Sequence, residues 1–280
     1  MSHRREILEA ARAGDVESQF ALACDYDFTP PKNKKLAIQW YHKAAQQGHA
    51  KSQNFLGESY RDGWTVELNL PEAISWLRLA AAQGEPNAQL SLGAALFYGD
   101  GVRCDRAKAL AWYRKAAKQG IASAALNIGH IYRSGDGVAQ NWHSAIRWYL
   151  RAAEAGNLAA IHWLGRIYGG KEQYTENRRK AFHWLRLAAE GGDTQSQCDL
   201  GVCYVNGRGT TADPVTGALW YRRAAQSGDV WAAYLLGLCY RDGTGVRRNC
   251  RLARHWFEKA LALGVNEAKA ALEAMPQTIP

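Results

Sequence analysis

Tryptophan recurs at a spacing of 36 residues along the whole chain, at Trp40, Trp76, Trp112, Trp148, Trp184, Trp220 and Trp256. Glycine keeps the same spacing at Gly57, Gly93, Gly129, Gly165, Gly201 and Gly237, each time after Leu or Ile. A fixed period of this length identifies a solenoid, in which similar units stack and each contacts mainly its neighbours. The function of such a chain has to be sought on a repeated surface.

Each unit is predicted to be a hairpin of two helices. In residues 122–134, Ala125, Ile128 and Tyr132 have the spacings of three, four and seven that place side chains on one helical face. A loop with two glycines then stops this first helix, because glycine adopts positive φ at little cost. The helical period resumes in residues 145–153, which form the second helix.

The recurrent glycine lies in the middle of the first helix, where it costs roughly 0.5 to 1 kcal/mol relative to alanine. Its recurrence predicts that the second helix approaches too closely for a side chain. At Gly129 we expect the small Ala152 and Ala153 to face it. The tryptophans all occupy one phase of the repeat, so we expect them in the core between units rather than at a cofactor or nucleic-acid base.

Three motifs, Leu-Gly-x-x-Tyr, Gly-x-Gly-Val and Ala-x-x-Trp-Tyr-x-x-Ala-Ala-x-x-Gly, resemble the Sel1-like repeat, a relative of tetratricopeptide-type helical repeats. The resemblance covers nearly the whole chain and is most complete in residues 128–153 and 236–264. The sequence departs from it at Ala23, where glycine is expected, at Leu96, where tyrosine is expected, and in the loop at residues 169–173.

The repeats predict an all-α fold, a right-handed superhelical α/α solenoid that forms one array over residues 1–280. Residues 15–264 supply seven hairpins. We expect residues 1–14 to form an N-terminal capping helix and residues 265–280 a C-terminal capping helix and tail, because a stack otherwise ends in exposed core.

Composition favours a cytoplasmic location. No apolar run of 18 residues could span a bilayer, and charged residues interrupt any signal-like start. The cysteines do not recur in each unit, so thiols are favoured over disulfides, and a redox pair of Cys203 and Cys239 is the minor alternative. The six are Cys24, Cys104, Cys198, Cys203, Cys239 and Cys250.

We expect no catalytic residue, no cofactor and no metal site, and therefore no enzyme. The chain has no Gly-x-Ser-x-Gly, His-Glu-x-x-His or P-loop signature, and no Cys-x-x-Cys or paired histidines for zinc. His130 and His162 could converge on neighbouring first helices, but an ordinary surface pair is favoured over an acid/base pair.

Four positions of each first helix are expected to point into a concave groove: six and three residues before the recurrent glycine, and one and four residues after it. They vary strongly within the chain, and apolar side chains beside arginines are typical of protein-binding hot spots. The alternative is that several pack against the next helix and the partner uses a loop edge or the convex face. The candidates are Asn54, Glu58, Arg61, Leu90, Phe97, Leu126, His130, Arg133, His162, Arg166, Trp231, Tyr234, Leu238 and Arg241.

The formal net charge is +9, and basic residues cluster in 32–43, 171–186 and 241–259. These segments surround the loops into second helices and could line one edge of the array. An acidic partner surface would be attracted to such an edge; a solvated basic edge without a partner is the alternative.

The sequence thus predicts a non-catalytic scaffold or adaptor that recognises a protein or peptide through its groove. The resemblance implies that such arrays serve as adaptors in signalling and membrane-associated complexes. It also implies that some bacterial members neutralise toxins, so an immunity protein is a specific alternative. RNA binding is less favoured, because a one-base-per-repeat code needs equivalent polar residues, whereas these positions alternate among Leu, His, Cys and Tyr.

Overall fold

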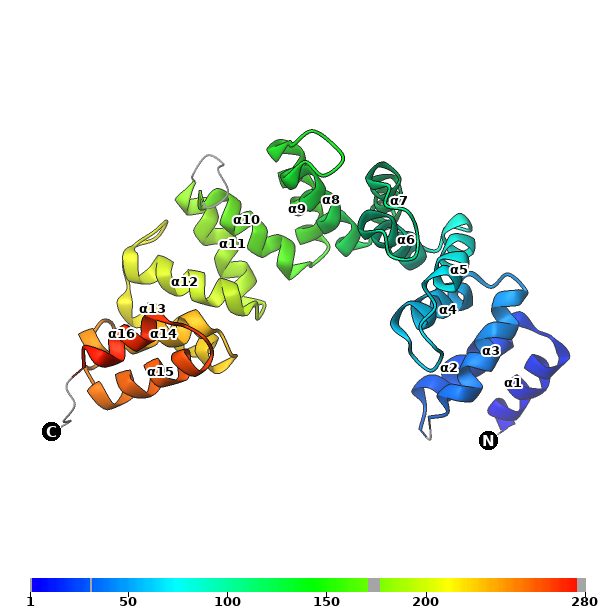
Figure 1. Cartoon of the computed structure of the whole chain (residues 1–280), viewed down its shortest axis with the longest axis horizontal. Helices are drawn as coiled ribbons and strands as arrows, with labels where there is room; N and C mark the ends of the chain where they lie inside the picture. Colours follow the sequence, from blue (N-terminus) through cyan, green and yellow to red (C-terminus); the bar gives the residue numbers. More distant parts are fainter. Residues whose placement is uncertain (1, 31, 171–176, 276–280) are drawn as a thin grey trace. The chain divides into compact units, whose positions relative to one another are not determined.

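The computed structural model describes residues 2–30, 32–170 and 177–275, and all regular structure in these ranges is α-helical (Figure 1). This confirms the predicted all-α solenoid of helical hairpins. The helices are α1 (Ser2–Ala13), α2 (Val16–Phe28), α3 (Lys34–Gln46), α4 (Ala50–Asp62), α5 (Leu70–Ala82), α6 (Pro86–Tyr98), α7 (Arg106–Lys118), α8 (Ala122–Ser134), α9 (Trp142–Glu154), α10 (Leu158–Tyr168), α11 (Arg178–Glu190), α12 (Thr194–Asn206), α13 (Pro214–Gln226), α14 (Val230–Asp242), α15 (Cys250–Ala262) and α16 (Glu267–Glu273).

None of the described helices is both long and apolar enough to cross a bilayer. Of the unusual loop at residues 169–173, positions 171–173 lie outside the described residues.

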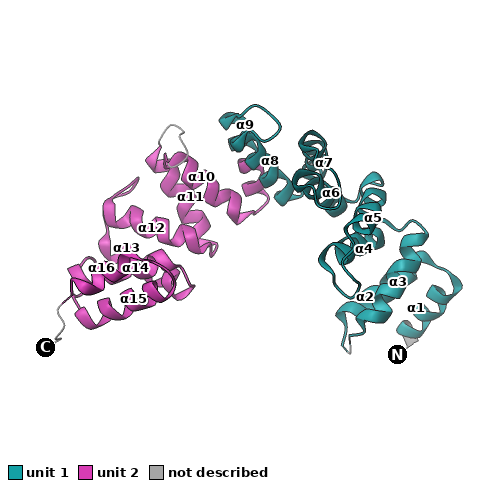
Figure 2. Cartoon of the chain, viewed as in Figure 1, with its two compact units in different colours: residues 1–148 teal, residues 149–280 magenta. Residues whose placement is uncertain are grey.

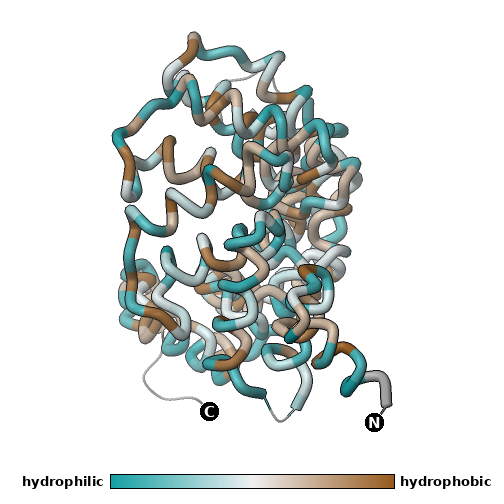
Figure 3. Tube along the Cα trace, turned by 90° about the vertical axis from the view of Figure 1, so that its right-hand side faces the viewer, coloured by the Kyte–Doolittle hydropathy of each residue, from teal (hydrophilic) through white to brown (hydrophobic). Residues whose placement is uncertain are grey.

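The chain forms two compact units, residues 1–148 and 149–280 (Figure 2). The even-numbered helices from α2 to α14 are the first helices of hairpins, and the second helices α3, α5, α7, α11 and α13 each pack against the first helix that follows. Apolar and polar residues alternate along the helices (Figure 3). Helix α1 packs on α2 and α16 packs on α15, at the places where capping helices were expected.

The recurrent glycine lies directly against a large side chain of its second helix. A Cβ on Gly201 would come within 2.6 Å of the ring of Tyr221, and a Cβ on Gly237 equally close to the ring of Phe257. Real atoms do not approach so closely in a packed interior, so only glycine fits. The predicted close approach is confirmed, but at the glycines whose surroundings are described the facing side chain is a large one, not a pair of alanines.

The facing residue is the one that follows the recurrent tryptophan, and the expectation that the tryptophans themselves form the core is only partly right. Tyr41, Tyr113 and Phe257 are fully buried, whereas among the recurrent tryptophans only Trp40 is buried and the others are half-buried. Several tryptophans lie beneath a cation three residues later, as where Nζ of Lys115 lies 3.8 Å from the ring centroid of Trp112. The tryptophans therefore border the core.

An Asn or Asp seven residues before each tryptophan begins every second helix. In α15 the side chain of Asn249 accepts a hydrogen bond from the backbone N–H of Leu252 at 2.9 Å, which is an N-cap. The backbone N–H of Asn249 donates to the carbonyl of Tyr240 at 2.8 Å. One residue thus caps the second helix and ties it to the end of the first. The set is Asn33, Asn69, Asp105, Asn141, Asn177, Asp213 and Asn249.

Pairs of one buried and one exposed glutamine connect the helices of the first three hairpins. The amide of Gln53 donates to the carbonyl of Ala45 at 3.0 Å and accepts from the amide of Gln83 at 2.8 Å. In the sixth hairpin Gln197 still donates to the carbonyl of Ala189 at 3.3 Å. Ser227 stands where the second glutamine would be, and Oε1 of Gln197 has no hydrogen-bond partner among the described residues. The other two pairs are Gln19 with Gln47 and Gln89 with Gln119.

Replacing the buried residue after a tryptophan should cost more than replacing the tryptophan. We expect Tyr221→Ala to lower the free energy of unfolding by about 3 to 5 kcal/mol, because it empties a packed position. We expect Trp220→Ala to lower it by about 1 to 2 kcal/mol, because that side chain is already half in water. Urea unfolding followed by circular dichroism measures both, and a larger loss for Trp220→Ala would contradict this description of the core.

Ser227→Gln should restore the missing glutamine pair. We expect it to raise the free energy of unfolding by about 0.5 to 1.5 kcal/mol, because the buried Oε1 of Gln197 would gain a donor. Ser227→Ala is the matched control, since it alters the same exposed position without adding a donor. Equal stabilities of the two variants in urea unfolding would show that no such bond forms.

Candidate functional site

The four variable positions of each first helix are here called the variable stripe. Among the predicted candidates Trp231 is exposed, with 47% of its surface accessible, and His162 is buried. All the other candidates are half-buried. The recurrent glycines and the leucines or isoleucines before them are buried on the same helices wherever the structure classes them, for example Leu56 and Ile128. Apart from the buried His162 and Cys198, the stripe is therefore an accessible or half-buried side of the first helices that changes from one unit to the next.

A pocket of about 310 Å³ opens beside the stripe in the first unit, between α6, α7 and α8. Phe97 and Tyr98 meet edge to face in its wall, with ring centroids 5.1 Å apart. His130, Arg133 and Asn127 line it from α8. The structure thus brings together three predicted residues, Phe97, His130 and Arg133. Tyr98 and Asn127 were missed because they lie outside the four positions considered.

His130 is neutral in this pocket near pH 7. Burial, together with the nearby positive charge of Arg133, lowers the pKa of His130 to about 4. A neutral imidazole offers one hydrogen-bond donor and one acceptor, where an imidazolium would offer two donors. The pocket wall beside the aromatic rings is therefore suited to polar, uncharged groups.

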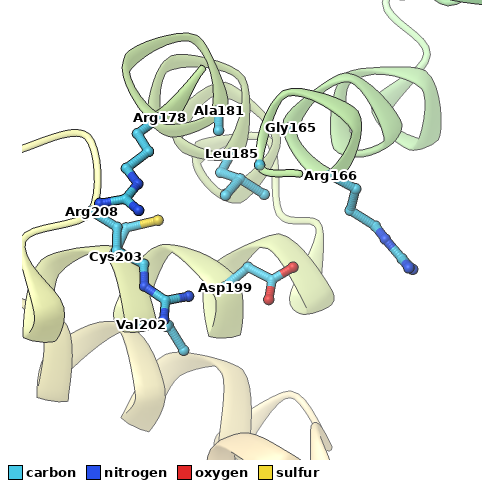
Figure 4. Close-up of a pocket in the computed structure, with 10 residues that line it drawn as sticks. Gly165, Arg166, Arg178, Ala181, Leu185, Asp199, Val202, Cys203 and Arg208 are labelled. Carbon is cyan, nitrogen blue, oxygen red and sulfur yellow. The ribbon is translucent and has the colours of Figure 1, made fainter. Parts of the chain in front are cut away.

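A smaller pocket of about 60 Å³ lies in the second unit, between α10, α11 and α12 (Figure 4). Leu185 and Val202 give it apolar surface. Arg178 and Arg208 lie on one side of it, and Arg166 extends away from them on the other. The two pockets occupy equivalent places in the repeat. Leu185, Asp199, Val202, Cys203 and Arg208 stand two periods after Tyr113, Asn127, His130, Ile131 and Asp136.

An apolar cluster covers the stripe of α14. The ring of Trp231 meets that of Tyr234 edge to face, with centroids 6.1 Å apart, and Tyr234 in turn lies 5.7 Å from the buried ring of Phe257. Leu238 packs partly against the same core. The exposed indole is thus supported from below by rings of the fold, and it presents a fixed apolar surface.

Two predicted arginines make contacts within their own helix. Arg61 donates two hydrogen bonds to the carboxylate of Asp62, at 2.7 and 2.9 Å, and Arg241 does the same to Asp242 at 2.7 and 2.8 Å. These bonds lower the pKa of Asp62 and of Asp242. Each guanidinium is therefore held in one orientation, and its charge is largely balanced before any partner arrives.

His162 is not on an accessible surface, although the sequence analysis placed it in the groove. Its Nδ1 forms a 2.7 Å hydrogen bond with Oγ of Ser196 and lies 3.3 Å from Oδ1 of Asp193, the residue that caps α12. Burial favours a higher pKa for Asp193, but the hydrogen bonds from His162 and Ser196 lower it below its usual value. His162 therefore joins two consecutive hairpins of the second unit.

Comparisons with known proteins agree with this architecture. The Sel1 repeat model matches residues 16–49, 50–85, 86–121, 122–157, 158–193, 194–229 and 232–265. A protective antigen present in uropathogenic Escherichia coli strains, with an SLR fold, is 30% identical with a TM-score of 0.91, over 96% of this chain and 58% of the antigen chain. This chain therefore spans little more than half of that antigen.

Two further solved structures resemble this chain to different degrees. A Sel1 repeat protein from Oxalobacter formigenes is 28% identical with a TM-score of 0.67, over 99% of this chain and 98% of that one. An immunity protein from Pseudomonas aeruginosa is 19% identical with a TM-score of 0.48, over 76% of this chain and 82% of that one. The latter similarity is too low to support an inference about function. Among curated proteins, none matches the sequence.

The neutral state of His130 predicts a pH dependence of stability. The folded pKa of about 4 lies below the ordinary value of 6.5, so the unfolded chain binds the proton more tightly. Stability should therefore fall as pH drops through 6.5 and level off below about 4, by on the order of 1 to 3 kcal/mol in total. His130→Gln should show a smaller fall in thermal melts between these pH values, and identical pH profiles would contradict the assignment.

Proposed function

The chain belongs to the Sel1 repeat family, and on that premise we propose that it is a non-catalytic scaffold that binds another protein or peptide through the variable stripe. Proteins of this family are generally scaffolds for protein interaction. The recurrent glycine, the tryptophan and the Asn or Asp cap repeat along the chain, whereas the residues of the variable stripe differ between units. A protein partner with an irregular surface matches such a sequence of different side chains.

The observation that carries the proposal is the exposed indole of Trp231 on a supported aromatic cluster. A large apolar side chain that is 47% accessible and fixed by neighbouring rings has the features of a binding hot spot. The pocket beside Phe97 and His130 adds a second place on the stripe where a partner side chain can enter. The remaining candidates, such as Leu90 and Leu126, would contribute contact area between such places.

The similarity to immunity proteins concerns the fold alone. The stripe does not repeat polar side chains as an RNA code would. We also place the protein in the cytoplasm, because its cysteines do not follow the repeat as structural disulfides would.

Trp231→Ala should weaken partner binding without unfolding the chain. We expect a loss of about tenfold or more in affinity, because truncation of a central aromatic anchor commonly costs 2 kcal/mol or more. The partner is first captured from source cells with the wild-type chain, identified by mass spectrometry, and then purified to measure affinities. Circular dichroism checks that helix content is preserved.

Leu219→Ala is the matched control. Leu219 is 54% exposed but lies on α13, a second helix, so its truncation removes a similar exposed apolar surface from outside the stripe. The proposal requires wild-type affinity for this variant and reduced affinity for Trp231→Ala. If Leu219→Ala loses binding and Trp231→Ala retains it, the partner uses the second helices and the proposal is wrong.

A further inference from the structure

The third hairpin departs from the repeat at Leu96, and a large cavity opens there. The first helices of the neighbouring hairpins carry a tyrosine at this position, Tyr60 and Tyr132. The cavity beside Leu96 has a volume of about 690 Å³, a size typical of sites that receive side chains or small ligands. Arg78 of α5 and Trp112 of α7 also line it, so it lies within the first unit, where α6 packs between these two second helices.

In other hairpins the tyrosine binds a basic residue of the preceding second helix. The phenol oxygen of Tyr132 accepts a hydrogen bond from the guanidinium group of Arg114 at 2.6 Å. Tyr240 accepts one from Arg222 in the same way, at 2.7 Å. In both places the bond joins one hairpin to the next, and it occupies the donor groups of the arginine.

Arg78 has lost this partner. It stands one period before Arg114, but Leu96 has no hydroxyl group to accept its hydrogen bond. Arg78 makes no hydrogen bond, ion pair or ring contact with any residue in the described part of the chain. By contrast Arg186, another equivalent, has its Nε 3.9 Å from Oε1 of Glu190. The donor groups of Arg78 can therefore bind a group from outside the chain.

Apolar and basic side chains form the rest of the lining. Leu92 is buried and supplies apolar surface, and the ring of Trp112 is half-buried beside it. Arg103 in the loop and Lys108 on α7 are exposed cations. The acid of the lining, Asp105, lies 3.0 Å from Nζ of Lys108 and also caps α7. The cavity thus combines an apolar surface with a surplus of positive charge.

We propose that the cavity beside Leu96 binds a tyrosine side chain of a partner polypeptide, whose hydroxyl accepts a hydrogen bond from Arg78 as the fold's own tyrosine does from Arg114. The guest ring gains contact with the ring of Trp112 and with the apolar lining. The charge of Arg103 favours acidic residues beside the tyrosine. None of the stripe positions of α6 lines this cavity, so the inference adds a second surface to the proposed function.

The test uses three short peptides as probes on the full chain. Acetyl-Glu-Ala-Tyr-Ala-Glu-amide carries the proposed side chain, and the same peptide with Phe or Leu at its centre lacks the hydroxyl or the ring. Binding is followed by the Nε–Hε signal of Arg78 and the indole N–H signal of Trp112 in nitrogen-edited NMR spectra. We expect a dissociation constant on the order of 1 mM for the Tyr peptide, about fivefold weaker binding of the Phe peptide, and no shifts with the Leu peptide.

Leu96→Tyr separates binding from folding. This variant restores the residue of the neighbouring hairpins, so we expect its hydroxyl to accept a hydrogen bond from Arg78 and the thermal stability to be no lower than that of the wild type. Affinity for the Tyr peptide should fall about tenfold or more, because the site is filled from within.

Arg78→Gln tests the hydrogen bond itself. This variant should reduce the preference for the Tyr peptide over the Phe peptide to less than about twofold, because the two peptides differ only in the hydroxyl. Arg251→Gln is the matched control, since it makes the same change in net charge at an exposed arginine of another second helix, α15. It should leave the affinities for both peptides unchanged.

The outcomes distinguish this inference from the proposed function. If folded Leu96→Tyr binds the Tyr peptide as tightly as the wild type, or if Arg78→Gln keeps the fivefold preference, the tyrosine site is wrong. Equal losses in Arg78→Gln and Arg251→Gln would also contradict it, because they would reflect net charge alone. If Leu96→Tyr fails to fold, the preference measured with Arg78→Gln decides. The scaffold proposal stands or fails separately, by the effect of Trp231→Ala on the native partner.

Discussion

The contact between the recurrent glycine of a first helix and a large side chain of its second helix is the constraint on which the rest of the structure depends; it is described at Gly57, Gly93, Gly165, Gly201 and Gly237. Because a Cβ on Gly201 or Gly237 would overlap a ring, the two helices can lie in only one close arrangement. The Asn or Asp cap then fixes where the second helix begins relative to the end of the first. These positions therefore keep the same residue types in nearly all units, whereas the other surface positions of the first helices vary.

The sequence was sufficient for the helices and their order, because the 36-residue period leaves the phase of every unit unambiguous. The sequence was not sufficient to predict which side chains are buried. Trp220 and Tyr221 recur equally well but point about 100° apart on their helix, and only contact with the glycine decides which one is buried. His162 shows the same limit, since helical position alone could not reveal that Ser196 and Asp193 cover it. The pockets were partly foreseeable: Phe97 and His130 followed from the stripe, whereas Arg208 belongs to a loop whose packing against α11 appears only in three dimensions.

The two pockets show how a repeated framework gains selectivity. Asp136 lines one pocket and Arg208, two periods later, lines the other, so the charge at this loop position differs between the two units while the 36-residue period is kept. The pockets also differ at a second position, where Phe97 of the larger pocket carries a ring and Gly169 of the smaller pocket carries no side chain. On a surface of this type, a few substitutions at positions that do not contribute to folding can change which partner is recognised.

The glutamine pairs have a consequence for cooperativity. In a linear stack, the coupling between neighbouring elements decides whether the array opens all at once or frays from one end. Residues 1–148 contain three such pairs, whereas the sixth hairpin keeps only the first glutamine, Gln197. In the other hairpins the first glutamine is replaced by Ala125, Ile161 and Ala233. The later hairpins are coupled by other contacts, as where His162 of the fifth hairpin bonds to Ser196 of the sixth. The hairpin that carries Trp231 has no glutamine pair, so the position of its helices depends instead on the apolar core around Phe257.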